Sequence, residues 1–278
     1  MKIGFLGPKG TFSQQAAEIY IDGLHAELIQ FANIAELIFA VNNGKIDEAV
    51  VPVENSIEGP VNVTLDMMAW DVDLKIKREI VVPIIHNLMV NKKQKNISLI
   101  LSHPQAIGQC REFLNKHYPN IPIKYTYSTA QAAQLVAEHS FSDNNEGWAA
   151  IAAQKASEEY NLVITHRSIQ DKSNNVTRFI VLSQYSAEKT ENSKTSIIFS
   201  TENKPGSLYR ILQILHLWDI NMTRIESRPA KNNLGNYIFF VDIEGHWEDD
   251  DIRDALTMIK RKTSFFKMLG SYPINSAD

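Results

Sequence analysis

Cysteine is almost absent from this 278-residue chain, which contains Cys110 and no other. A single cysteine cannot form a disulfide within the chain, and this favours a reducing compartment, the cytoplasm. The sequence also lacks an excess of positive charge, with 28 Lys and Arg against 32 Asp and Glu. Because binding to nucleic acid requires cations that neutralise phosphates, this balance argues against nucleic acid as a partner.

Long apolar runs are missing as well. The first run ends at Leu6, which is too short for a signal peptide, and no run approaches the roughly 18 residues of a membrane span. We therefore expect that the protein is neither exported nor inserted into a membrane. The eight histidines are scattered, without HExxH or CxxC, so no metal is expected. The segment GPKGT at 7–11 lacks the spacing of phosphate and dinucleotide loops, so no cofactor is expected.

What is present is an ordinary globular composition, 44% hydrophobic and 22% charged, in a chain long enough for two domains of about 150 residues. The first part alternates short apolar runs with amphipathic segments. Strands are predicted at 2–6, 26–31 and 48–53, and Thr11 and Asn33 are predicted to cap the helices between them. This order is typical of a doubly wound α/β sheet.

The same rhythm resumes after 74–90, a β-rich segment that contains no predicted helix. Helices are expected at 105–117, from 128 onward and at 152–160, and strands at 97–101, 121–127, 148–151, 162–164 and 176–182. The uninterrupted segment suggests two lobes, one of about 1–78 with 161–184 and one of about 79–160. A cleft between two lobes is a common place for a small ligand.

The last part of the chain follows a different pattern. Residues 185–194 are polar and charged, which indicates a linker between a catalytic domain at 1–184 and a second domain at 195–278. In that domain the order is strand, helix, two strands, helix, strand, with a turn at 231–236, as in the ferredoxin-like βαββαβ fold. Since the helices cover one face of such a sheet, we expect the other face to bind a second copy, giving a homo-oligomer.

Polar side chains gather where the predicted strands of the first domain end. In open α/β sheets, ligands bind at this edge, near helix N-termini. These side chains are mostly hydroxyls and amides, with few cations, and such neutral hydrogen-bond donors can bind the carboxylates of a small dicarboxylate. The side chains concerned are Thr11, Glu54, Asn55, Ser56, Ser102, Gln105 and Ser128. A simpler interpretation is that Thr11, Asn33 and Ser128 only cap helices, and for each of them alone the cap is favoured.

Several long strings, in this order along the chain, resemble the motifs of the prephenate dehydratase family. They are FLGPKGTFSQQAA, VPVENSIEGPVNVTLD, SHPQAIGQC, STAQAA and NNVTRFIVL. Two later strings, TENKPGSLYRIL and ESRP, resemble the ligand-binding segments of the ACT regulatory domain. The resemblance implies a two-lobed, periplasmic-binding-protein-like catalytic domain followed by an ACT domain. Bifunctional relatives begin with a chorismate mutase domain, whereas this chain starts at the first dehydratase strand, so we expect a monofunctional enzyme.

The resemblance implies a lyase that converts prephenate to phenylpyruvate, water and carbon dioxide in L-phenylalanine biosynthesis. The family has its essential threonine in the TRF string, here Thr177. On a strand, Thr177 and Phe179 face one side and Arg178 the other. We expect Thr177 at the leaving hydroxyl and Phe179 at the ring, while Arg178 pairs with a carboxylate or reaches the substrate only if the strand ends there. Glu54 is an alternative acid if burial favours its neutral form.

The residues expected to bind the substrate are therefore Thr11, Asn55, Ser56, Ser102, Gln105, Ser128, Arg178 and Phe179. In the ACT domain the resemblance implies that L-phenylalanine binds between paired domains of a dimer or a dimer of dimers (a homotetramer). The expected effector residues are Asn203, Pro205, Gly206, Ser207, Leu208, Glu226, Ser227, Arg228 and Pro229. Alternatives are an ACT module that only dimerises, activity on arogenate, and a non-catalytic small-molecule sensor, since two-lobed clefts also bind solutes.

Overall fold

The computed structural model describes residues 1–92, 96–139, 147–230 and 236–274. Spatial contacts divide the chain into two compact units, each built from segments that are far apart in the sequence. The first unit consists of Met1–Leu37, Val50–Val61 and Val81–Phe179, and the second of Ile38–Ala49, Asn62–Ile80 and Ile180–Asp278. None of the helices within the described ranges is long and apolar enough to cross a membrane.

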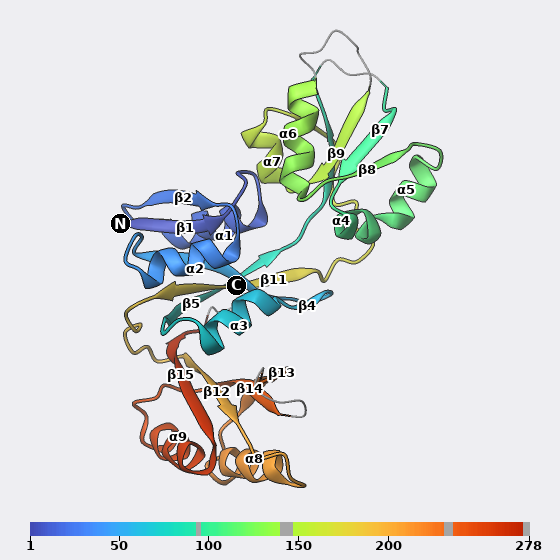
Figure 1. The fold of residues 1–278 in the computed structure, drawn as a ribbon. Coiled ribbons are helices and arrows are strands. Elements are labelled where there is room, and N and C mark those ends of the chain that lie inside the picture. Colours follow the sequence, from blue (N-terminus) through green and yellow to red (C-terminus); the bar gives the residue numbers. More distant parts are fainter. Residues whose placement is uncertain (93–95, 140–146, 231–235, 275–278) are drawn as a thin grey trace. The chain divides into compact units, whose positions relative to one another are not determined.

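The first of the three sheets formed by the described residues has the strand order β2-β1-β3-β11-β5, with β4 paired to β3 (Figure 1). Its strands are β1 (Lys2–Leu6), β2 (Glu27–Phe31), β3 (Glu48–Asn55), β4 (Gly59–Pro60), β5 (Lys75–Pro83) and β11 (Val176–Ser183). Helices α1 (Phe12–Ile21), α2 (Ile34–Asn42) and α3 (Asn62–Trp70) lie between them in the sequence. The strands predicted at 2–6, 26–31 and 48–53 are confirmed, and Ile3 and Val51 in two of them are fully buried.

The turns after these strands are held by the predicted helix caps. Thr11 Oγ1 accepts the backbone N–H of Gln14 at 3.2 Å, and Asn33 Oδ1 accepts that of Glu36 at 2.8 Å. Gly10, next to the first cap, has φ +82° and lies so close to Ala156 that a Cβ would come within 2.9 Å of its Cα. Only glycine fits both conditions, and it fixes the turn that carries Thr11.

The second sheet lies in the first unit and has the order β10-β6-β9-β7-β8. Its strands are β6 (Asn87–Val90), β7 (Leu99–Ser102), β8 (Ile123–Tyr125), β9 (Trp148–Ala152) and β10 (Val163–His166), and its helices are α4 (Pro104–Gln109), α5 (Arg111–His117), α6 (Thr129–His139) and α7 (Gln154–Glu159). Alternate residues face opposite sides. Leu88 and Ile151 pack against α4 and α5, whereas Met89 and Ala150 pack against α6 and α7. The two pairs of helices therefore cover opposite faces of the sheet (Figure 1). The predicted double winding is confirmed for this sheet.

Three details of this sheet differ from the sequence prediction. The strand β10 pairs with β6, with Val163 opposite Val90, so the chain leaves the second sheet later than the expected lobe boundary at residue 161. The helix expected at 105–117 is two helices, because Cys110 between them has φ −115° and ψ 20°. The strand expected at 121–127 is only the three residues of β8.

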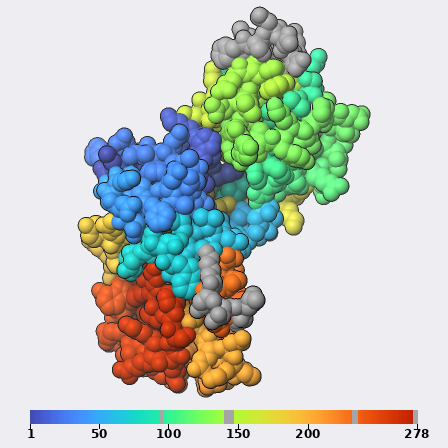
Figure 2. Space-filling model, viewed as in Figure 1, coloured from blue at the N-terminus to red at the C-terminus, as the bar shows by residue number. Residues whose placement is uncertain are grey.

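The third sheet belongs to the second unit and has the order β13-β14-β12-β15. Its elements, in chain order, are β12 (Ser193–Ser200), α8 (Ser207–Leu217), β13 (Met222–Pro229), β14 (Tyr237–Glu244), α9 (Asp250–Lys262) and β15 (Phe265–Pro273). The predicted βαββαβ order is confirmed. Ile197 and Val241 of the sheet pack with Ile211 of α8 and Ile259 of α9, and the outer sides of both helices lie at the surface (Figure 2). The predicted turn at 231–236 lies outside the described residues except for Asn236.

Candidate active site

A cavity of about 360 Å³ lies within the first unit. It is lined by side chains from 6–13, 52–61, 84–86, 103–109, 127–129 and 175–179. Most of these segments begin at the ends of strands in the first two sheets, which is where the sequence predicts a binding site. The volume is within the range of small-molecule sites.

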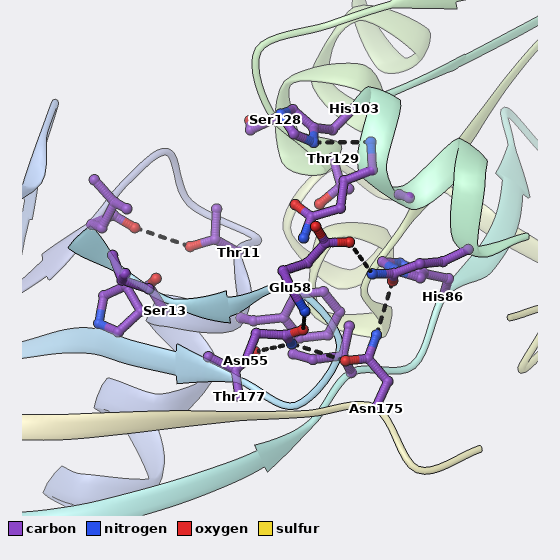
Figure 3. A pocket seen from close by; sticks show the side chains of 18 of the residues that line it. Thr11, Ser13, Asn55, Glu58, His86, His103, Ser128, Thr129, Asn175 and Thr177 are labelled. Atoms are coloured by element: carbon purple, nitrogen blue, oxygen red, sulfur yellow. Dashed lines mark hydrogen bonds between the residues drawn. The ribbon is translucent and has the colours of Figure 1, made fainter. Parts of the chain in front are cut away.

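Asn55, at the end of β3, has an orientation that the backbone determines. Its Oδ1 accepts the N–H groups of Ile57 and Glu58, each at 3.0 Å. The other end of the amide is therefore the donor. Asn55 Nδ2 donates to Thr177 Oγ1 at 2.9 Å and to Asn175 Oδ1 at 2.8 Å (Figure 3).

Thr177 lies near the start of β11 and lines the cavity. Its oxygen accepts the hydrogen bond from Asn55, and its own O–H has no acceptor among the described residues. The hydroxyl is therefore left to donate to a molecule in the cavity. Phe179 lines the same cavity and is 2% exposed, so the strand places Thr177 and Phe179 on one side, as the alternation of side chains predicts.

Arg178 faces away from these two residues, and it is not among the residues that line the cavity. Its Nε lies 3.6 Å from Glu54 Oε2, and the two side chains are 15% and 37% exposed. At the end of β3, Asn55 lines the cavity, whereas Glu54 is not among the lining residues. The geometry thus places the candidate acid Glu54 in an ion pair with Arg178, outside the cavity lining.

Two of the predicted substrate-binding serines hold backbone groups. Ser102 is fully buried, and its Oγ donates to the carbonyl of Ile151 on the neighbouring strand at 2.7 Å. Ser56 Oγ donates to the carbonyl of Asn174 at 3.0 Å and accepts the N–H of Val176 at 3.0 Å. Neither serine is among the cavity-lining residues.

Three further predicted residues do line the cavity: Thr11, Gln105 and Ser128. Thr11 is also the cap of α1, and Ser128 Oγ accepts the N–H of Gln131 at 3.0 Å at the start of α6. Both hydroxyls therefore have the capping role that the sequence favours for them. Gln105 lies in the first turn of α4 and has an amide side chain that is available to a ligand.

The structure adds cavity residues that sequence reasoning missed. Gln109 Oε1 accepts from Asn175 Nδ2 at 2.8 Å and lies 3.0 Å from His86 Nε2, while Gln109 Nε2 donates to Glu58 Oε1 at 3.3 Å. Gln109 lies in the string SHPQAIGQC and Asn175 in NNVTRFIVL, so the resemblance of these strings to the family motifs was the signal that could have identified both residues. His86 is 3% exposed, and burial lowers its pKa against the opposing effect of its bond to Gln109.

Two family models match the sequence of this chain. A model described as "Prephenate dehydratase" matches residues 3–187, and one described as "ACT domain" matches 195–257. The chain belongs to the prephenate dehydratase family. The prephenate dehydratase of Methanocaldococcus jannaschii is 40% identical to it, over 96% of this chain and 96% of that protein.

Solved structures of similar sequence cover almost the whole chain. The prephenate dehydratase of Arthrobacter aurescens, in complex with L-Phe, has a TM-score of 0.89 and 35% identity, and the match covers 99% of this chain and 90% of that one. A structure described as GqqA, a novel type of quorum quenching acylase, has a TM-score of 0.85 and 27% identity, with 99% and 98% covered. The fold of this prephenate dehydratase family is therefore shared by a protein described as having a different activity.

The two predicted effector segments of the ACT domain lie at the same end of the third sheet, one after β12 and one at the end of β13. Ser200, before the segment 203–208, and Arg228 both lie opposite Ile238 of β14. One strand therefore separates the two segments, a distance of about 10 Å between β12 and β13. Gly206 is the cap of α8 with φ 77°, and Arg228 Nη2 lies 3.2 Å from Asp66 Oδ1 of α3, in the same compact unit.

The described residues contain no group of three or more His, Cys, Asp or Glu that could hold a metal ion. Cys110, the single thiol, is fully buried in the core of the second sheet. Its burial, with a smaller contribution from the charge of Asp171, raises the pKa of the Cys110 thiol to about 12. At neutral pH the thiol is therefore not a nucleophile.

Proposed function

We propose that this member of the family is a prephenate dehydratase, which converts prephenate to phenylpyruvate, water and carbon dioxide. The observation that carries the proposal is the Thr177 hydroxyl. It accepts a hydrogen bond from Asn55 at 2.9 Å and keeps its own proton for a molecule in the cavity. A donor placed in this way suits a reaction in which a hydroxyl must leave.

The reaction requires little beyond such a donor. The bond between the ring and its carboxylate breaks, carbon dioxide leaves, and the electron pair moves into the ring. The C–O bond to the ring hydroxyl then breaks, and the ring becomes aromatic. The dianion of prephenate takes up one proton in total, since hydroxide leaves as water. Thr177 donates a hydrogen bond to that oxygen as charge develops on it, and removal of one such positioned donor typically lowers kcat by about 10²–10³-fold.

Neutral groups around Thr177 would bind the two carboxylates of the substrate. The amides of Gln105 and Gln109 line the cavity, and Thr129 at the start of α6 lies on its wall. Amide donors and the N-terminus of a helix both favour anions. Phe179 supplies an apolar surface for the ring.

The test is to incubate the purified chain with prephenate and to measure phenylpyruvate and carbon dioxide against a protein-free control. Formation of both products well above the spontaneous background is expected. Arogenate is assayed in parallel, because an amine there replaces the keto group of the substrate. Binding of prephenate without any turnover would instead support a small-molecule sensor and would contradict the proposal.

The ACT domain leads to the second half of the proposal, regulation by L-phenylalanine. We expect the effector to bind at the segments 203–208 and 226–229, with two copies of the chain paired through their ACT domains in a dimer or a dimer of dimers. The Arthrobacter aurescens protein in complex with L-Phe supports this choice of ligand. A cytoplasmic location, favoured by the single buried cysteine, stays a prediction.

A further inference from the structure

His86 is a buried histidine whose main chain and ring are both held in place. It lies between β5 and β6, and 3% of its surface is exposed. Its N–H donates to Gln170 Oε1 at 3.0 Å, and its carbonyl accepts the N–H of Ile169 at 2.9 Å. The ring meets that of Phe12 edge to face, with the centroids 5.8 Å apart. The side chain is therefore fixed where it lines the cavity.

The hydrogen bonds around His86 determine which of its nitrogens carries the proton. The backbone fixes Asn55 with Nδ2 as donor, and Asn55 Nδ2 donates to Asn175 Oδ1. Asn175 must then use its Nδ2 toward Gln109 Oε1, at 2.8 Å. Because the amide oxygen of Gln109 only accepts, His86 Nε2 must donate to it over the 3.0 Å between them.

The other nitrogen of the ring takes no part in this network. His86 Nδ1 is buried and has no hydrogen-bond partner. A second proton there would place an uncompensated charge in the protein interior, and burial accordingly lowers the pKa of His86. The ring is thus a neutral imidazole with its single proton on Nε2.

Gln109 is held by two donors at its oxygen, and this leaves only one orientation for its amide. With Oε1 turned toward His86 and Asn175, Nε2 points to Glu58, 3.3 Å away, at the wall of the cavity. Without His86, the amide of Gln109 would be held only by Asn175 at its oxygen and by the longer, exposed bond to Glu58 at its nitrogen. The bond from His86 at 3.0 Å adds a second, buried donor at the oxygen.

We propose that His86 is a positioning residue that acts through Gln109: its Nε2–H holds the amide of Gln109 with the donor end toward Glu58 and the bound substrate. This inference rests on the proposed function, because the reaction of the cavity is its main readout. His86 does not donate to the substrate itself. A purely structural histidine would affect folding and leave turnover of the folded enzyme unchanged.

The first experiment compares His86→Leu with His86→Gln in steady-state assays with prephenate. The Nε2 group of glutamine can replace the imidazole Nε2–H, whereas leucine donates nothing. We expect His86→Leu to lower kcat by about tenfold, the effect of one hydrogen bond, and His86→Gln to recover most of it. The matched control is His246→Leu, another buried histidine but in the second unit, which is expected to leave kcat unchanged. Equal losses for the two His86 variants, or none for His86→Leu, would overturn the inference.

A double-mutant cycle separates this inference from the proposed function. If His86 acts through Gln109, His86→Leu has almost no further effect on kcat in a Gln109→Leu background, whereas additive effects contradict the inference. The same four proteins are also compared by urea unfolding. If His86 and Gln109 are in contact, the effects of the two substitutions on the urea midpoint are not additive, and this result does not depend on which reaction the protein catalyses. A wild-type protein that does not turn over prephenate but has non-additive midpoints refutes the proposed function alone. If the effects of the two substitutions on the urea midpoint are additive, His86 and Gln109 are not in contact, and the inference is refuted.

Discussion

Asn55 Nδ2 and Thr177 Oγ1 lie 2.9 Å apart, although 122 positions separate them in the sequence. The bond leaves the hydroxyl proton of Thr177 available to the cavity, and this leads to a prediction about the hydroxyl alone. Thr177→Val keeps the size and shape of the side chain but removes the donor. We expect kcat for prephenate to fall by about 10²–10³-fold.

The matched variant for this prediction is Thr177→Ser, which keeps the hydroxyl and loses one methyl group. It is expected to retain a kcat within about tenfold of the wild type, because the hydroxyl can still accept from Asn55. Thermal unfolding of both variants checks that they fold. Near-normal turnover by Thr177→Val would remove the hydroxyl from the mechanism.

The structure separates Ser102 from Gln105, although both occur in one recognised string. Ser102 is buried and bound to the carbonyl of Ile151, so Ser102→Ala should lower the free energy of unfolding by about 1 kcal/mol without changing KM. Gln105 lines the cavity, so Gln105→Ala should raise KM for prephenate several-fold with little loss of stability. Steady-state kinetics and urea unfolding of both variants test this division. The reverse pattern would place the serine at the substrate.

Much of the fold follows from local patterns in the sequence. Periodic apolar residues and capping side chains predict most of the strands in the three sheets and the starts of α1 and α2, because these signals act over a few residues. The pairing of Thr177 with Phe179 on one side of β11 is also local, since it depends only on the alternation of a strand. Which side chains of a strand share a face can therefore be predicted without knowledge of the tertiary structure.

The remaining features depend on contacts between distant segments. Gln109 meets Asn175 over 66 positions and His86 over 23, and nothing in the local sequence marks His86 as a partner. Ser102 shows the same limit, because its place in the protein depends on the pairing of β7 with β9. A recognised string indicates which segments line a site, whereas tertiary pairing decides which side chains of the string reach it.

A third prediction concerns the ion pair between Arg228 of the ESRP string and Asp66 of α3, whose side chains are 19% and 20% exposed. The helix α3 begins at Asn62, directly after the cavity-lining residues Gly59, Pro60 and Val61. If phenylalanine binds near Arg228, this pair links the effector to a helix that directly follows the cavity-lining segment in the sequence. We expect Asp66→Asn to reduce the response of the rate to phenylalanine by about fivefold or more, as loss of 1 kcal/mol of coupling implies.

The control for that prediction is Arg253→Gln, which breaks an exposed ion pair with Asp250 on α9. Exposed pairs of this kind contribute little, so its response to phenylalanine should match that of the wild type. Rates are measured over a range of phenylalanine concentrations for all three proteins. An Asp66→Asn variant with an unchanged response would show that the signal takes another route.

The fourth prediction is a dependence of stability on pH that originates at His86. Burial lowers the pKa of His86 in the folded chain, whereas in the unfolded chain the imidazole takes up a proton near pH 6.5. The contribution of neutral His86 is therefore complete above about pH 6.5, and it is lost as the pH falls below that value. Urea midpoints at about pH 7 and about pH 5.5 should differ more for the wild type than for His86→Gln. Parallel changes in the two proteins would show that other groups, such as carboxylates, cause the loss.

The last prediction concerns the single thiol. Cys110 is fully buried, and its pKa is raised to about 12, so almost no thiolate exists near pH 8 and reagents have no access to it. We expect an aromatic disulfide reagent to label the folded protein at least 100-fold more slowly than a free thiol, and to label one thiol per chain in urea. Cys110→Ala provides the blank. Rapid labelling of the native protein would mean that the contact between α4, α5 and the second sheet opens readily, which contradicts the packed core in which the thiol lies.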